Sequence, residues 1–114
     1  MTMNTLLRGL KPMHPGELLR DVVLPSIKKP KTEIADLLGI SRPTLYGILS
    51  EAKPVTTPMA LRIGKLCGNG PELWLNLQQK YDIWMEEHVK THDRIVPLIK
   101  NGELLESQEE LRVA

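Results

Sequence analysis

The sequence predicts an all-α fold of five helices, and three observations support this fold class. Apolar residues recur at three- and four-residue steps through most of the chain. Prolines and glycines fall where these periodic stretches begin and end. Residues 31–50 form two such stretches joined by a tight turn, which is the pattern of a helix-turn-helix. With 114 residues, the chain is long enough to bury one core without disulfides or metal.

The first helix is expected to begin at Pro15, because proline suits the first turn of a helix and Glu17 is favourable near its positive end. Pro25 is expected to end this helix, and a basic loop, residues 26–31, follows it. Residues 1–12 have no clear period and are expected to form a flexible N-terminal arm.

The ends of the two helices in the predicted helix-turn-helix are marked by their residue types. Thr32 is expected to cap the first of them, which runs to about Leu38. Gly39 then permits the positive φ that commonly ends a helix. Ser41 is expected to cap the second helix, which runs to Leu49.

The second of these helices has an inner and an outer face. Leu45 and Ile48 are spaced to point into the core, and Ala35 is small where the two helices must cross closely. An ordinary pair of helices in a helical core would show a similar pattern. In a DNA-binding helix-turn-helix the outer face lies in the major groove. Here that face consists of Arg42, Pro43, Tyr46, Gly47 and Ser50.

The fourth helix is expected to begin at Thr57, which precedes Pro58, and to end at the Gly-Asn-Gly of residues 68–70. The fifth opens after residue 70 and contains an aromatic stripe that includes Trp74 and Trp84. At helical spacing, such a stripe favours a core or a dimer interface over a ligand-binding or base-stacking surface.

Residues 92–114 are expected to be an extension of a helix-turn-helix domain that covers residues 13–91. Pro97 restricts any strand in this extension to a sheet edge, and Asn101-Gly102 is typical of a turn. Ser107 and Glu110 resemble a capping box for a last short helix.

The net charge is only +1, but it is unevenly distributed. Residues 1–69 contain ten Lys and Arg against five Asp and Glu, whereas residues 70–114 contain five against nine. Basic charge therefore gathers around the helix-turn-helix, where DNA phosphates would need it. The lone Cys67 excludes an intrachain disulfide and is expected to be a small core residue. Without a signal peptide or a long apolar run, a cytoplasmic protein with no membrane association is expected.

Arg42 and Tyr46 lie one turn apart at the front of the predicted recognition helix. Arg42 can donate two parallel hydrogen bonds to guanine, and a phosphate or an intrachain carboxylate is its alternative partner. Tyr46 can contact a thymine methyl group or a phosphate, while Thr44 is expected to be half-buried. Phosphate contacts are expected from Lys31, Thr32, Ser41, Ser50 and Lys53.

His88 and His92 have the spacing that can hold a metal on one face of a helix. No third ligand is well placed, so two solvated histidines are expected and no metal or cofactor is predicted. His14 is expected at a helix start. The chain has no Gly-rich phosphate loop and no Ser-His-Asp set, so no catalytic residues are predicted.

Three segments within residues 13–84 resemble the HigA/VapI type of antitoxin in the XRE (Cro/C1-like) helix-turn-helix family. They are MHPGELLRDVVLP, EIADLLGISRPTLYGIL and TTPMALRIGKLCGNGPELWLNLQQKYDIW. The pieces HPGE, SRPTL, TPMALRI and PELWLNLQQKYD are far more specific than a generic helix-turn-helix. The resemblance implies a five-helix, lambda-repressor-like domain and a homodimer on a palindromic operator. It also implies a HigB-like toxin of the RelE fold that cleaves messenger RNA.

The chain departs from this family at two places. The family usually has an Asn-Gly pair and basic residues after the recognition helix, whereas this chain has Ser50, Glu51, Ala52 and Lys53. Glu51 would be mildly unfavourable near phosphates. Pro30 stands before the second helix, where the family usually lacks a proline.

The expected function is therefore an antitoxin that also represses its own operon and has no enzymatic activity. A stand-alone XRE repressor without a toxin partner would bind DNA in the same way. A protein-interaction module that uses the fold without DNA, and a metal-dependent enzyme built on His88 and His92, are alternatives of other classes.

Overall fold

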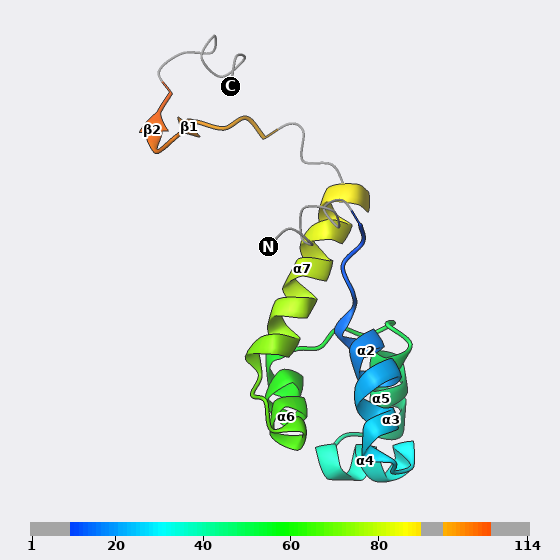
Figure 1. Ribbon diagram of the computed structural model, residues 1–114. Helices are drawn as coiled ribbons and strands as arrows, with labels where there is room; N and C mark the ends of the chain where they lie inside the picture. Colours follow the sequence, from blue (N-terminus) through cyan, green and yellow to red (C-terminus); the bar gives the residue numbers. More distant parts are fainter. Residues whose placement is uncertain (1–9, 90–94, 106–114) are drawn as a thin grey trace.

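The computed structural model of the chain describes residues 10–89 and 95–105, which form a helical body followed by a small hairpin (Figure 1). The helical segments are α2 (Pro15–Leu18), η1 (Leu19–Val23), α3 (Leu24–Ile27), α4 (Lys31–Leu38), α5 (Arg42–Leu49), α6 (Thr57–Cys67) and α7 (Glu72–Val89). The first three follow one another without a break, so they make one helix and the described residues contain the five helices predicted. None of these helices combines the length and the hydrophobicity needed to cross a lipid bilayer.

The first helix continues past Pro25, so the prediction that this proline ends it is wrong. The segment η1 is a π turn, and the amide of Leu24 donates to the carbonyl of Leu19, five residues back. Pro25 is then the second residue of α3. In a continuous α-helix its ring would clash with the carbonyl four residues earlier, and the wider turn before it accommodates the ring. The helix ends where Lys28 adopts a positive φ of 61°.

The start of α4 also differs from the prediction. Pro30, rather than Thr32, precedes the helix, and its carbonyl accepts hydrogen bonds from the amides of Glu33 and Ile34 at 3.0 Å each. Thr32 is therefore the second helical residue. Pro30 fits here because the residue before a helix has extended backbone, with φ −59° and ψ 148° in this case. α6 begins at Thr57, as predicted, and Thr56 is the residue before it, with extended backbone.

The core lies where the first helix, α4, α5, α6 and the beginning of α7 meet. Leu45 and Ile48 are each 1% exposed, which confirms the predicted inner face, and Ala35 is fully buried. Trp74 is also fully buried, and its indole Nε1 donates to Asn69 Oδ1 at 3.3 Å. The other buried apolar side chains are Leu19, Leu24, Ile34, Leu38, Leu49, Val55, Met59, Ala60 and Ile63.

The first helix approaches α5 closely, and Gly16 makes this approach possible. A Cβ at Gly16 would overlap the backbone carbonyl of Ile48. His14 caps this helix, because its Nδ1 accepts a hydrogen bond from the amide of Gly16 at 2.9 Å. This N-cap position confirms the prediction that His14 belongs to a helix start, and its side chain is buried, at 2% exposed.

The chain beyond α7 contains two short antiparallel strands, β1 (Ile99–Lys100) and β2 (Glu103–Leu104). Asn101 and Gly102 connect them with positive φ values of 54° and 82°, which confirms the predicted turn. The hairpin lies beyond the far end of α7, away from the other helices (Figure 1). The predicted capping box of Ser107 and Glu110 lies outside the described residues.

Candidate nucleic-acid interface

The helix α5 is the recognition helix of the predicted helix-turn-helix, and a side-chain cap fixes its beginning. Ser41 has extended backbone, and its Oγ accepts a hydrogen bond from the amide of Thr44 at 3.2 Å. The two hydroxyl oxygens, Ser41 Oγ and Thr44 Oγ1, are 2.8 Å apart and share a second hydrogen bond. The cap is confirmed, and Thr44 is half-buried as expected.

The outer face of α5 is open to solvent. Arg42, Pro43 and Ser50 are exposed, and Tyr46 is 45% exposed. Within the described residues, the Arg42 side chain makes no hydrogen bond or ion pair, so no carboxylate in this part of the chain occupies its guanidinium. The guanidinium is therefore available to an external acceptor.

The segment after α5 folds back onto the end of this helix. The carbonyl of Gly47 accepts hydrogen bonds from the amide of Lys53 at 3.0 Å and from Ser50 Oγ at 3.2 Å. The aliphatic chain of Lys53 then lies against Gly47, so that a Cβ there would be 2.7 Å from Lys53 Cδ. Gly47 is consequently only partly exposed, and Lys53 is held beside the recognition helix although it follows α5 in sequence.

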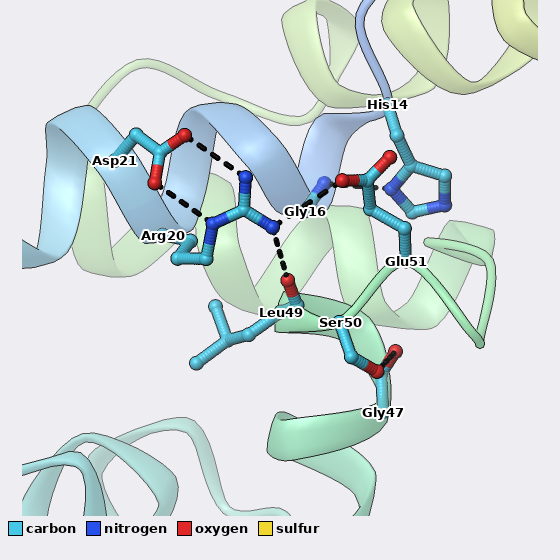
Figure 2. Close-up of polar contacts among 8 residues, drawn as sticks. All are labelled: His14, Gly16, Arg20, Asp21, Gly47, Leu49, Ser50 and Glu51. Atoms are coloured by element: carbon cyan, nitrogen blue, oxygen red, sulfur yellow. Dashed lines mark hydrogen bonds and ion pairs between the residues drawn. The ribbon is translucent and has the colours of Figure 1, made fainter.

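Arg20 of the first helix binds the C-terminal end of α5 (Figure 2). Its Nη1 donates to the carbonyl of Leu49 at 2.9 Å and to Glu51 Oε2 at 3.3 Å. The positive charge of Arg20 offsets the negative charge of the Glu51 carboxylate. This contact therefore reduces the repulsion expected between Glu51 and DNA phosphates. A cation at a helix C-terminus also satisfies carbonyls that lack helical partners.

The same guanidinium binds Asp21 with two hydrogen bonds, from Nε to Oδ1 at 2.8 Å and from Nη2 to Oδ2 at 2.9 Å (Figure 2). These hydrogen bonds lower the pKa of Asp21 from its usual value. Sequence reasoning missed Arg20, because nothing in the linear pattern shows that the first helix reaches the end of α5. The only signal was that Arg20 is the one cation of this helix, whose other charged residues are Glu17 and Asp21.

A second basic group surrounds the beginning of α4. Lys28, Lys29 and Lys31 are all exposed. Lys29 forms an ion pair with Glu33, with 3.2 Å between Nζ and Oε1, whereas Lys28 and Lys31 have no ion pair within the described residues. Of the predicted phosphate contacts, Lys31 is exposed and Thr32 is half-buried.

The histidine pair considered as a metal site is only partly described. His88 Nδ1 lies 2.8 Å from the carbonyl of Trp84, and its ring stacks on the indole with centroids 4.0 Å apart. His92 lies outside the described residues. Among the residues that are described, no three His, Cys, Asp or Glu side chains come together to hold a metal. Cys67 is partly buried at the edge of the core, and burial raises the pKa of its thiol.

Comparisons with known proteins agree with this geometry, although no protein-family model matches the sequence. The chain is 31% identical over 90 residues to an uncharacterised HTH-type transcriptional regulator of Haemophilus influenzae, covering 79% of this chain and 84% of that protein. It is 30% identical over 74 residues to antitoxin HigA-1 of Vibrio cholerae, covering 65% and 70%. The solved structure of antitoxin GraA in complex with its operator matches with a TM-score of 0.73 and 32% identity, covering 82% of this chain and 97% of that one. The chain therefore belongs to the HigA/VapI-type antitoxin family of helix-turn-helix proteins.

Proposed function

We propose that this chain is the antitoxin of a type II toxin–antitoxin module. It binds a palindromic operator as a homodimer, represses its own operon and neutralises a HigB-like, RelE-fold toxin that cleaves messenger RNA. The observation that supports this most is the exposed outer face of α5 on a helix capped at its beginning by Ser41 and bound at its end by Arg20. The similarity to GraA, whose structure was solved in complex with its operator, supports the same function.

In this proposal, the side chains at the front of α5 read the operator sequence. Arg42 donates two hydrogen bonds to the O6 and N7 atoms of a guanine, which is the commonest specific contact in a major groove. Tyr46, one turn further, contacts a thymine methyl group or a phosphate. Pro43 and Gly47 lie on the same face, where Gly47 is small enough to leave room for the aliphatic chain of Lys53.

Phosphate contacts fix the orientation of α5 in the groove. The proposed donors are the ammonium groups of Lys31 and Lys53 and the hydroxyl groups of Ser41, Ser50 and Thr32. Such contacts give affinity without base preference. The position of Lys53 beside Gly47 places a cation at the end of α5, where the family's usual basic residues are missing.

A dimer would place two copies of α5 in successive major grooves. The half-sites of the operator are then about 34 Å apart, or separated by a multiple of one helical turn. Palindromic operators follow from the two-fold symmetry of such a dimer.

The toxin contact is proposed for a surface away from the basic helix-turn-helix. A nuclease that acts on messenger RNA needs a basic surface, so an acidic surface on the antitoxin would be complementary. The candidates are residues 1–12 and the acidic side chains of residues 70–114, of which Glu72, Asp82 and Glu87 lie exposed on α7. The basic face around α5 remains free for DNA.

The DNA-reading role is tested by comparing R42A with K53A on the promoter of the chain's own gene and on a scrambled duplex. R42A should weaken operator binding by roughly 1–3 kcal/mol and relax base preference at one position in each half-site. K53A should weaken binding to both duplexes alike. Equal losses on both duplexes for both variants would make Arg42 only a phosphate contact.

The antitoxin role is tested by co-expressing the chain with the product of the adjacent gene. The neighbour should arrest growth when expressed alone, and it should co-purify with this chain when both are present. A neighbour that is harmless, or that never co-purifies, would favour the stand-alone repressor.

A further inference from the structure

The turn between α4 and α5 is held by a residue from a third helix. Arg62 of α6 reaches back to this turn, and its Nη1 donates to the carbonyl of Leu38 at 2.8 Å and to that of Gly39 at 3.4 Å. These acceptors are 24 and 23 residues earlier in the chain. Arg62 therefore connects α6 with the one segment that joins the two helices of the helix-turn-helix.

The two carbonyls have no partner in the local hydrogen-bond pattern of the turn. The amide of Ile40 donates to Ala35 at 3.0 Å and that of Gly39 donates to Asp36 at 3.1 Å, which satisfies the earlier carbonyls of α4. The last carbonyls of a helix remain unpaired and have partial negative charge. A guanidinium, with its fixed array of donors, suits two adjacent carbonyls of this kind.

Gly39 makes room for this contact. It adopts a positive φ of 70°, and a Cβ there would lie 2.7 Å from Arg62 Nη1. The open side of this glycine is therefore occupied by the guanidinium. Only Ile40 and Ser41 separate the turn from α5, so a rotation of the backbone at Gly39 would change the direction of the recognition helix.

We propose that Arg62 is a positioning residue for operator recognition, which fixes the direction of α5 through the carbonyls of Leu38 and Gly39. It acts on base reading through the turn and contributes no phosphate contact of its own. This inference rests on the proposed binding of operator DNA. It adds a residue outside the helix-turn-helix that determines how well the protein distinguishes operator from random DNA.

The test compares R62Q and R62K with a matched control, K65Q. Lys65 lies one turn further along α6 and lines the same surface groove as Arg62, together with Leu37, Leu61 and Leu66. K65Q removes one positive charge from this groove, as R62Q does, but leaves the hydrogen bonds to the turn intact. Each variant is titrated against the promoter duplex and a scrambled duplex over a range of salt, at a temperature where circular dichroism shows it folded.

R62Q should reduce the ratio of operator to random-DNA affinity about tenfold, since it removes hydrogen bonds from a charged donor. Its affinity for the scrambled duplex and its salt dependence should stay near those of the wild type. R62K should recover part of the ratio, because an ammonium group reaches one carbonyl but not both. K65Q should leave the ratio unchanged.

Two results would overturn the inference. One is an equal loss on both duplexes with a salt slope reduced by about one, which would make Arg62 a phosphate contact. The other is an unchanged ratio in R62Q. If R62Q does not fold, amide chemical shifts of Ile40 and Ser41 in R62K decide instead, because positioning requires that they move and unchanged shifts would contradict it. A wild-type chain that binds neither duplex would refute the proposed function itself.

Discussion

The helix-turn-helix, residues 31–50, is stabilised by contacts with other helices. The C-terminal hairpin, residues 95–105, is stabilised by contacts between its own two strands. In the helix-turn-helix each inward side chain is buried, and side chains from other helices bind the ends of α4 and α5. In the hairpin, the two strands pair only with each other among the residues that the structure describes, and Leu98, Ile99 and Leu104 are 59%, 63% and 69% exposed. Both regions are rich in apolar residues, yet only the first has buried them.

This difference shows what positions a recognition helix. The pattern inside residues 31–50 makes two helices, but Arg20 and Arg62, which lie outside it, bind the carbonyls at the end of each one. A short hairpin without such partners depends on its turn alone. Stability is therefore expected to be concentrated in the helical body.

The largest expected effect is that of W74A. Trp74 is fully buried at the base of α7, and truncation of a buried tryptophan costs about 3–5 kcal/mol. Chemical denaturation should show this loss or no folded protein at all. W84A is the control, because Trp84 is only partly buried and its truncation should lower the free energy of unfolding by less. Equal losses would mean that the far half of α7 is as tightly packed as its beginning.

A smaller effect is expected for S41A, which removes the cap of α5. Loss of a serine cap costs about 1 kcal/mol, and thermal unfolding at neutral pH would measure it. S50A, at the other end of the same helix, removes only a hydroxyl bonded to the Gly47 carbonyl and should cost less. If S50A is the more damaging variant, the cap at Ser41 does not stabilise the helix as described.

Stability should also fall at mildly acidic pH because of His14. Burial lowers its pKa from the usual 6.5, while nearby carboxylates such as Glu51 and Asp82 oppose this effect, and its Nδ1 must stay unprotonated to accept from Gly16. The unfolded chain therefore binds the proton more readily, so the contribution of His14 is complete above about pH 6.5 and is lost as the pH falls below it.

Unfolding experiments at several pH values would check this, with H14N as the matched variant. Asparagine keeps a capping oxygen but does not titrate. The loss of stability below about pH 6.5 should be smaller in H14N than in the wild type. The same dependence in both proteins would assign it to other groups.

The smallest effect is expected for I99T in the hairpin. Ile99 is mostly exposed, and substitutions of exposed residues usually change stability by less than about 0.5 kcal/mol. A loss above about 1 kcal/mol would show that the hairpin packs against the body or against a second copy of the chain. The claim that the hairpin contributes little to stability, unlike the helix-turn-helix, would then be wrong.

Much of the fold was predictable because its signals are local. The αL glycine at Gly39, the serine cap at Ser41 and the inner face of Leu45 and Ile48 depend on residues close in sequence, and all are confirmed. The helix end at Pro25 was predicted wrongly, because a π turn accommodates a proline that an α-helix would not.

The candidate site was predictable only in part. Its outer face follows from helical spacing, and Arg42 and Tyr46 are exposed as the pattern requires. The contacts that orient this face were not predictable, since Arg20 and Arg62 reach it over 29 and 24 residues of sequence. The same holds for Lys53, whose position over Gly47 depends on how the chain turns after α5.

The most direct test of DNA reading by α5 is a hydroxyl-radical footprint of the wild type and R42A on the promoter of the chain's own gene. We expect the wild type to protect two half-sites whose centres are about 34 Å apart, or separated by a multiple of one turn. R42A should lose this protection at concentrations where K53A still retains the pattern in weakened form. Protection of a single half-site, or of the scrambled duplex to the same degree, would contradict sequence-specific binding by a dimer.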